Sequence, residues 1–484
     1  MQRHDDKYRS HIMPAPDGST PYDFVYDKAE VISDRGGTVD ISAAILELSI
    51  FEHLWQSYQH GRMLLVDTAD LFQSIQFRGT EKVEFIISFP NDENKGPYKK
   101  RFVITHIESH KKGNDNAAVI LVNLVEEHFY QSKIKKVNRA YEGKPNEIIT
   151  KLLRDNQIDK TLVKNRLKHS SIRYIVPWIT PLKAADYVTE KATTERGLPY
   201  FLFSPIALEK KLVWKSLREI LERPPIWQEE FIYSQVYTGK QDGEIGGGSG
   251  AIDINDPRNT PAQRSRAGRM IMEEKGLTIE NYQHWDAYDL LSRIQSGTIG
   301  ARYNIRNVNQ FDFENYHFGY DEALSEIETF LPPNQKRFTY DNESYGGLHS
   351  NDAARFYISY LNLIYSDGTP NPFDLEMQDN SKRQAVARGL RDNMKMDNLD
   401  IQVPGYHFFP NSGDFNAVED GRSIGRNLRM LFMNNDTEFD PEEPDKFIDK
   451  KLSGQYFVTS AHHHFDETKY TVSLTCCKYS ELNE

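Results

Sequence analysis

The sequence predicts a mainly β protein with α+β parts, in which two similar antiparallel β-barrels accompany a mixed α/β domain and loop insertions. Three observations support this fold class. Apolar residues alternate with polar ones along many short segments, a pattern typical of half-buried strands. The chain holds 26 Tyr and 26 Phe, and aromatic residues favour strands and broad contact surfaces. Two hairpins of similar sequence lie near the two ends, which indicates a repeated β unit.

The overall composition is that of globular domains. A chain of 484 residues has room for roughly three domains. It contains no run of about 18 apolar residues, so we expect no membrane insertion, and its charged N-terminus lacks the apolar core of a signal peptide. The two cysteines, Cys476 and Cys477, are adjacent, which argues against a disulfide framework and favours synthesis in a reducing cytosol. The net charge of −12 argues against a broad or sequence-specific nucleic-acid-binding face.

The first part of the chain predicts a polar arm and a barrel. We expect an N-terminal arm over residues 1–19 and the first β-barrel over 20–130. In "EKVEFIISFP", Val83, Phe85 and Ile87 alternate with charged or polar residues, as in a strand with one buried face. "KRFVITHIESHKKGNDNAAVILVNLVEEHFY" then predicts a hairpin that turns at "KKGNDN".

A mixed α/β domain is predicted over 131–225. The segment "KPNEIITKLLRDNQI" predicts a helix that begins at Pro145, because proline suits the first helical position. A second helix is predicted to begin after an N-cap at Thr180, with Pro181 at its first position, and to stop at Gly197. "LPYFLFS" then predicts a return to strand.

The second β-barrel is predicted to start within 226–330 and to be completed by 400–484. A flexible loop rich in Gly, Asp and Arg, 244–269, lies in its first part. Between the two parts we expect an insertion over 331–399, which opens with a polar stretch over 331–352. The insertion ends with a predicted helix, "SKRQAVARGLRDNMKM", whose apolar side is formed by Val386, Leu390 and Met394.

The stretch "GQYFVTSAHHHFDETKYTVSLTCCKY", residues 454–479, holds three histidines and two cysteines and predicts a β-hairpin that turns at "DETK". Side chains alternate across a strand, so His462 and His464 share one face and His463 lies on the other. The face of His463 also holds Phe457, Thr459, Ala461 and Phe465, and that of His462 also holds Val458 and Ser460. A zinc site normally needs three or four protein ligands, so ordinary strands are the better interpretation of this stretch.

The two cysteines lead to the same interpretation. Cys476 falls on the apolar face of the returning strand and Cys477 on the opposite face, so the pair cannot offer two thiolates to one ion. We therefore predict no bound metal at His462, His463 or His464, and no disulfide between the cysteines.

Two hairpins can be compared directly. "RFVITHIESHKKGNDNAAVILVNL" (101–124) and "YFVTSAHHHFDETKYTVSLTCC" (456–477) both contain an aromatic-Val pair, turn on charged and small residues, and return as an alternating strand. The pairs are Phe102-Val103 and Phe457-Val458. Each hairpin follows another alternating strand, "KVEFIISF" or "NLRMLFM". The pattern predicts two superposable barrels, although any two hairpins resemble each other to some degree.

No catalytic motif is evident. The sequence lacks GxSxG, HExxH and Walker motifs. "GGGSG" (246–250) is followed by Ala and Ile, which indicates a linker rather than a phosphate loop. Asp253 and Asn255 begin like a calcium loop, but Arg264 occupies the position of the required Glu. The acidic run 434–445 is better interpreted as a solvated loop than as a cation site. We predict no catalytic, cofactor-binding or metal-binding residues and no cofactor, although 71 acidic residues leave a paired-carboxylate glycosidase site open.

The order of these segments resembles the central hub protein of contractile-phage baseplates of the T-even type, which is related to the base of type VI secretion spikes. The sequence "AAILELSIFEHL…GRMLLVDTADLFQSIQFRGTEKVEFIIS" looks like the first barrel of that family, with Gly79-Thr80-Glu81 before an alternating strand. Val176-Pro177-Trp178 before a helix is similar to its strand-Pro-Trp-helix passage. The final hairpin looks like its closing hairpin. The insertions at 244–269 and 331–352 depart from the family pattern.

The resemblance implies a virion protein of the tail baseplate with no enzymatic activity. It implies a homotrimer in which six tail-tube-like barrels form a pseudo-sixfold ring around part of the DNA exit channel. The implied partners are a trimeric spike protein on one side and tail-tube or tube-initiator proteins on the other. Baseplate wedge proteins would surround the ring, and the tape-measure protein would pass through it. The ring would let one assembly match hexameric and trimeric neighbours.

Two other classes remain as alternatives. A tail-associated peptidoglycan-degrading enzyme would be expected to add a compact α-rich or zinc-binding domain. A receptor-binding fibre would be expected to show fibrous or Gly-rich repeats. We further predict that part of the acidic excess lines the channel, because a basic wall would retain DNA through phosphate contacts.

Overall fold

The computed structural model describes most of the chain between residues 19 and 481. The described stretches are 19–33, 37–67, 75–112, 118–163, 172–233, 276–307, 312–319, 355–361, 377–410, 422–433 and 448–481. Some of these stretches contain short gaps. The predicted loop 244–269, the polar stretch 331–352, the acidic run 434–445 and the N-terminal arm up to residue 18 lie outside these stretches.

The mainly β prediction is confirmed. The first half contains β1 (Val25–Ser33), β2 (Gly37–Asp40), β3 (Ile45–His53), β4 (His60–Asp67), β5 (Lys82–Ser88), β6 (Tyr98–Lys112) and β7 (Ala118–Glu126). They lie in the order β3-β4-β7-β6-β5-β1-β2, and neighbouring strands are antiparallel. The predicted alternation holds, since Val83, Phe85 and Ile87 of β5 are buried. This pattern places one face of the sheet in the core.

The mixed region contains two helices where the sequence predicts them. Its elements are α2 (Glu127–Lys133), β8 (Ala140–Gly143), α3 (Pro145–Asp155), β9 (Thr161–Val163), β10 (Ile172–Ile175), α4 (Pro181–Lys191), β11 (Tyr200–Phe203), β12 (Lys211–Ser216) and α5 (Leu217–Leu221). Pro145 and Pro181 both occupy the first turn of their helices. A separate core fills this region, centred on Leu152, Val188 and Trp214.

Two details of α4 differ from the prediction. The helix ends at Lys191, because Ala192 is already extended, rather than continuing to Gly197. Gly197 instead adopts φ +82° in the turn that follows, where its N–H bonds the carbonyl of Thr194 at 2.9 Å. The Thr180 side chain does not accept a capping hydrogen bond. A glycine with positive φ therefore marked a turn, not a helix end.

The second half is β-rich as well. Its strands are β13 (Phe231–Tyr233), β14 (Asn281–Trp285), β18 (Asn398–Pro404), β19 (Asn427–Phe432), β20 (Gly454–Asp466) and β21 (Lys469–Glu481). The predicted hairpin is present as β20 and β21, and its turn falls within "DETK". The strands follow each other in the order β14-β18-β21-β20-β19-β13.

The two halves share one strand order. If β2 is set aside and the six remaining strands of each half are numbered along the chain, both halves have the spatial order 2-3-6-5-4-1. Four of the five neighbouring pairs are antiparallel in both halves; the last, β1·β5, is antiparallel whereas β13·β19 is parallel. The strands that precede the two hairpins, β5 and β19, occupy equivalent places, as the sequence comparison predicts.

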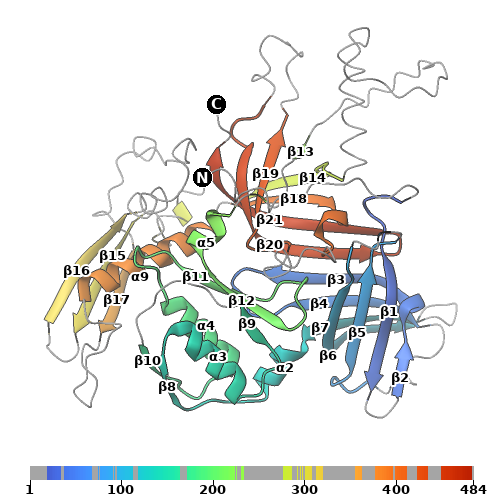
Figure 1. The fold of residues 1–484 in the computed structure, drawn as a ribbon, viewed down its shortest axis with the longest axis horizontal. Coiled ribbons are helices and arrows are strands. Elements are labelled where there is room, and N and C mark those ends of the chain that lie inside the picture. The colour runs from blue at the N-terminus through green and yellow to red at the C-terminus, as the bar shows by residue number, and fades with distance from the viewer. Residues whose placement is uncertain are drawn as a thin grey trace, which may run out of the picture.

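The pairings join both halves into one 13-stranded sheet (Figure 1). The junction is between β3 of the first half and β20 of the second. The described pairings do not close either half into a complete ring of strands. In the second half, however, the N–H of Ile232 bonds the carbonyl of Leu277 and the N–H of Ile279 bonds the carbonyl of Ile232, both at 2.9 Å. The two ends of that strand order therefore meet beside β14.

A smaller sheet and a helix complete the described structure. β15 (Gly300–Asn307) lies between β16 (Asp312–Gly319) and β17 (Arg355–Leu361), and α9 (Met377–Asn393) packs against this sheet. Val386, Leu390 and Met394 are buried, as predicted, with Met394 just beyond the helix end. Arg391 of α9 donates to the carbonyls of Thr189 and Tyr200 at 3.1 Å and ties the helix to the mixed region. Within the described residues no helix is long and apolar enough to cross a membrane.

Candidate functional site: the joint between the two halves

The joint is a seven-residue antiparallel pairing between strands far apart in the sequence. Ser460 lies opposite His53 and Asp466 opposite Glu47. A β-bulge at Thr459 immediately precedes this stretch in the pairing of β20 with β21. Before the bulge β20 pairs with β19, and after it β20 pairs with β3. Because a bulge bends its strand, it lets the two ends of β20 serve two different neighbours.

The first half contains an equivalent bulge at Thr105 in β6. The Thr105 hydroxyl donates to the carbonyl of Asn123 at 3.3 Å, and the Thr459 hydroxyl donates to the carbonyl of Thr475 at 3.0 Å. The residue just before each bulge also makes an equivalent backbone hydrogen bond. The N–H of Ile104 donates to the carbonyl of Glu81, and the N–H of Val458 donates to the carbonyl of Arg426. The structural equivalence therefore pairs Phe102 with Tyr456, one residue away from the Phe-Val alignment that the sequence comparison predicts.

His463 lies at the centre of the joint and is completely buried. Its Nε2 lies 2.5 Å from Oε1 of Glu52 on β3, and its Nδ1 lies 2.7 Å from the hydroxyl of Tyr470 on β21. In the neutral ring, Nε2 donates to the carboxylate and Nδ1 accepts the phenol hydrogen. The chain carboxylate–imidazole–phenol thus crosses the boundary between the two halves.

Glu52 collects further donors from segments distant in the sequence. The N–H of Ile206 donates to its Oε2 at 2.6 Å, and the Ser423 hydroxyl donates to its Oε1 at 2.5 Å. Tyr98 continues the network, since its hydroxyl lies 3.4 Å from that of Tyr470 and donates to the carbonyl of Phe408. Burial raises the pKa of Tyr470 well above its usual value, so this phenol stays protonated. A buried carboxylate is tolerated when its oxygens are hydrogen-bonded, and here they bind three segments together.

This arrangement is chemically suited to holding strands rather than to catalysis. The side chains of Glu52 and His463 are both 0% exposed. A general acid or base must reach a substrate proton within hydrogen-bond distance, and these groups face only protein atoms. The network acts as a polar clamp at the joint.

The solvent-facing side of the same joint carries a stack of rings. Phe51 lies between two imidazoles, with ring centroids 4.3 Å from His462 and 5.0 Å from His60, and His53 follows His60 at 5.8 Å. Burial lowers the pKa of all three histidines, that of His462 to about 4. An open groove of about 360 Å³ runs along this face, bordered in part by His53, His462 and Gln283.

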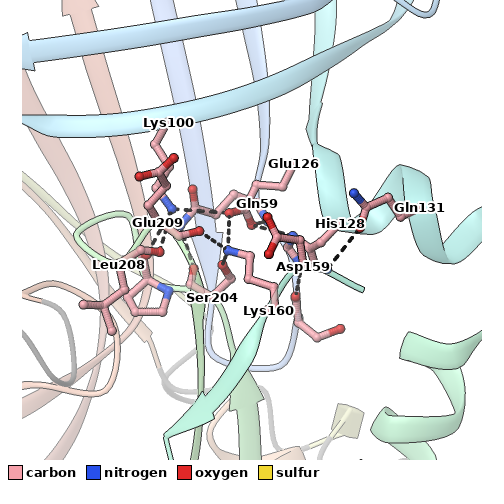
Figure 2. Close-up of polar contacts among 12 residues, drawn as sticks. Gln59, Lys100, Glu126, His128, Gln131, Asp159, Lys160, Ser204, Leu208 and Glu209 are labelled. Carbon is pink, nitrogen blue, oxygen red and sulfur yellow. Dashed lines mark hydrogen bonds and ion pairs between the residues drawn. The ribbon is translucent and has the colours of Figure 1, made fainter. Parts of the chain in front are cut away.

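A second buried cluster connects the first half to the mixed region (Figure 2). Oε1 of Glu126, at the end of β7, lies 3.3 Å from Nζ of Lys100 and 3.0 Å from Nζ of Lys160. Its Oε2 accepts from the N–H of Gln59 at 2.8 Å. The three charged side chains are at most 4% exposed. The two lysines also donate to carbonyl oxygens of the mixed region, and Lys160 donates to the hydroxyl of Ser204 at 3.5 Å.

The lysines of this cluster hold the loop after β11. Lys100 donates to the carbonyls of Pro205 and Leu208, and Lys160 donates to that of Glu209 at 2.7 Å. Burial would raise the pKa of Glu126, but attraction to Lys100 and Lys160 outweighs it and holds the pKa well below its usual range. Burial lowers the pKa of Lys100 to about 8.

His128 lies beside the same cluster. Its Nδ1 is 3.8 Å from Oε2 of Glu126, and its Nε2 is 2.8 Å from the carbonyl of Ser57. Burial lowers the pKa of His128 to about 4, so the ring is neutral near pH 7. The cluster therefore combines one carboxylate with two ammonium groups, and backbone carbonyls complete the lysine shells.

The histidine-rich hairpin lies within this site. His463 faces the core whereas His462 and His464 face solvent, as the alternation predicts. Before the bulge the prediction is wrong in one respect. Val458 is predicted to share the face of His462 but is completely buried, because the extra residue at Thr459 shifts the alternation. Cys476 is buried and Cys477 half-buried on the other side, both as free thiols. Among the described residues no group of three His, Cys, Asp or Glu side chains is arranged to hold a metal; the prediction that none binds stays a prediction.

The sequence contained a signal for this site that the motif search missed. Glu52 lies on the same face of its strand as the buried Leu48 and Ile50. Lys100 lies on the same face as the buried Phe102 and Ile104. Glu126 likewise follows Val122 and Leu124 on the inward face of β7. A charged residue at a core-facing position needs a partner, so each of these interruptions marks a buried polar contact.

Comparison with known proteins finds similarity in fold. No protein-family model matches the sequence, and no curated protein matches it. The tail protein from Neisseria meningitidis MC58 superposes with a TM-score of 0.48 at 12% identity, over 96% of this chain and 97% of that one. The 43 kDa tail protein of prophage MuSo2 from Shewanella oneidensis gives 0.45 at 7% identity, over 93% and 96%. The E. coli c3393 protein gives 0.37 at 9% identity, over 90% and 74%. It is described as a type VI secretion component with structural similarity to the T4 bacteriophage tail proteins gp27 and gp5.

Proposed function

We propose that this chain is the structural hub of a contractile phage tail baseplate, a trimeric ring that joins the hexameric tail tube to the trimeric spike. The observation that carries this function is the repeated strand order of the two halves, together with their equivalent bulges at Thr105 and Thr459. Each chain supplies two equivalent β units, so three chains supply six.

The duplication has a clear use in such an assembly. A ring of three chains has true threefold symmetry, which a trimeric spike can match, and approximate sixfold symmetry, which a hexameric tube can match. The proposed β units are barrels, formed by residues 20–130 and by 226–330 with 400–484. Residues 131–225 form a separate mixed domain, and 331–399 an insertion. The proposed neighbours are the spike, tube or tube-initiator proteins, wedge proteins and the tape-measure protein, in the virion baseplate.

The mixed region offers a face for one of these neighbours. Trp178 is 66% exposed and has φ +51°, a strained conformation for a large side chain, and Ile134 and Ile175 are 64% and 68% exposed. Residues 131–191 hold 14 of the 59 Lys and Arg residues but only six of the 71 Asp and Glu residues. An exposed indole in a segment of net positive charge fits an acidic protein partner.

The role is structural rather than enzymatic. The buried carboxylates Glu52 and Glu126 are both committed to contacts that hold segments together. A zymogram or turbidity assay on purified peptidoglycan provides the check. We expect no clearing by the purified chain, and clearing that depends on an acidic residue would contradict this role.

The mass in solution tests the ring directly. Native mass spectrometry or light scattering should give three times the 56.1 kDa of one chain at micromolar concentration. The contact between copies should bury on the order of 2,000 Å² or more. A chain that stays monomeric at high concentration, with tube and spike proteins present, would remove the ring and with it this function.

A further inference from the structure

The joint inside one chain is a template for a contact between chains. Along one side of β20, residues 454–457 pair with β19 and residues 460–466 pair with β3, while β21 covers the other side. The second half is thus completed along that side by a strand of the first half (Figure 1).

The equivalent stretch of the first half has no such neighbour among the described strands. β6 pairs with β5 over residues 98–103, bulges at Thr105 and again at Glu108, and continues to residue 112. In this last stretch β7 covers one side, and no described strand pairs with the other. Beyond Glu108, its edge N–H and C=O groups correspond to those that β20 gives to β3, because the second bulge has no counterpart within residues 460–466.

The equivalent of β3 also lacks a second neighbour among the described strands. β3 lies between β4 and β20, whereas its counterpart β14 pairs with β18 on one side only. Among the described strands none pairs with the other edge of residues 281–283. The two unpaired edges are therefore the two partners of the joint, one in each half.

We propose that β14 of one copy of this chain pairs with β6 of the next copy, in the antiparallel register of the β3–β20 joint. This contact rests on the proposed ring and specifies how its copies touch. Within one chain the joint connects the first half to the second half. The same kind of strand pairing would connect the second half of one chain to the first half of the next chain. Such a head-to-tail contact closes into a ring when the rotation is right.

The register follows from the pairings inside each half. His464 and Lys111 occupy equivalent positions in the two halves. His464 pairs with Thr471 and Lys111 pairs with Val119, and Thr471 and Val119 are equivalent residues of β21 and β7. Ser49 and Gln283 are equivalent in the same way, opposite Arg62 and Asp400. In the joint, His464 lies opposite Ser49, and the imidazole Nδ1 is 3.2 Å from the Ser49 hydroxyl. Transferred to the contact between copies, Lys111 lies opposite Gln283.

The physical reason for this contact is the state of the edges. An unpaired strand edge is a template for another strand, and adding one supplies main-chain hydrogen bonds without new side-chain chemistry. Lys111 and Gln283 are both exposed in the single chain, so they are accessible to another copy.

Disulfide trapping tests the register. In the variant with Lys111→Cys and Gln283→Cys, opposite residues of neighbouring copies come within the Cα separation that a disulfide needs, about 4.4–6.8 Å. Mild oxidation should convert most of the protein into covalent dimers and trimers on a non-reducing gel. The matched control, Lys111→Cys with Asn281→Cys, shifts one cysteine by two positions on the same face and should cross-link at least tenfold more slowly. Each single variant controls for reaction with Cys477.

A positive control sits within the chain. His464→Cys with Ser49→Cys should form the same bond inside one chain, which changes gel mobility but not mass. If this control oxidises and the trimer forms, but Lys111→Cys with Gln283→Cys does not cross-link above the shifted pair, the strand contact is wrong and the ring stands. If no trimer forms at all, both the contact and the proposed hub are overturned.

Discussion

His463 Nε2 lies 2.5 Å from Glu52 Oε1, and this pair joins two strands whose residues are 411 positions apart in the sequence. Both side chains are completely buried, so neither group can be solvated by water if its partner is lost. Removing one member of such a pair therefore costs far more than removing an exposed pair, because the other member keeps its desolvation cost.

The first prediction concerns Glu52. Glu52→Gln should lower the free energy of unfolding by about 2–4 kcal/mol, because an amide cannot accept from His463, Ser423 and Ile206 together. Glu47→Gln on the same strand is the control, since its side chain is 45% exposed, and it should change stability by less than about 0.5 kcal/mol. Urea unfolding followed by fluorescence measures both. Equal effects would show that the joint does not depend on the buried contact.

The second prediction concerns the cluster of Figure 2. Glu126→Gln leaves Lys100 and Lys160 buried without a counter-charge and should cost about 3–5 kcal/mol. Glu127→Gln, one residue later and partly exposed, serves as the control. Adding Lys100→Met to Glu126→Gln should recover part of the loss, because it removes one unpaired charge. A double-mutant cycle on the unfolding free energies measures the coupling, and additive losses would exclude it.

The third prediction concerns pH. The pKa of His462 is about 4 in the folded chain and near 6.5 when unfolded, so between these values the unfolded chain binds the proton more readily. The contribution of this ring to stability therefore falls as pH drops from 6.5 to 4 and then levels off. We expect the loss to reach about 2 kcal/mol at most, since solvent screens part of the half-buried ring.

A variant isolates this effect from other titrating groups. As pH falls through that window, the unaltered chain should lose more unfolding free energy than His462→Gln, so the difference between them should change in favour of the variant. Asp186, whose pKa burial raises to about 7, works in the opposite direction and cancels in the difference. A difference that stays constant between pH 7 and pH 4 would show that the stacked rings do not resist protonation.

The fourth prediction compares the two bulges. Thr459 is 1% exposed, so Thr459→Val leaves the carbonyl of Thr475 without its 3.0 Å donor and should cost about 1 kcal/mol. Thr105 is exposed, and water can replace its hydroxyl in Thr105→Val, which should cost a few tenths of a kcal/mol at most. Thermal or urea unfolding checks the order of the two effects; the reverse order would contradict the buried role of Thr459.

The sequence predicts the strands well because alternation is a local property. The buried faces of β5, β7 and β21 follow directly from it, as does the fact that His463 lies opposite to its two neighbours. The helices that begin at Pro145 and Pro181 are equally local, since proline at the first turn costs no hydrogen bond.

The parts that could not be predicted depend on distant partners. The inward position of Glu52 is visible in the sequence, but nothing local identifies His463 or Ser423 as its partners. The bulge at Thr459 is also hidden, because nothing in the local sequence marks the point where β20 leaves β19 and joins β3. It shifts the side-chain alternation by one, so the assignment of Val458 failed while that of His462 and His464 held.

The long separation between β3 and β20 has a consequence for synthesis. A ribosome that adds about 5–20 residues per second needs roughly 20 to 80 s to extend the chain from Glu52 to His463. During that interval β3 has been made but its partner has not, and the first half waits with an uncovered edge. The nascent chain is therefore most vulnerable to misassembly in the middle of translation. Its protection then depends on chaperones or on slow recruitment of other copies until the last hairpin emerges.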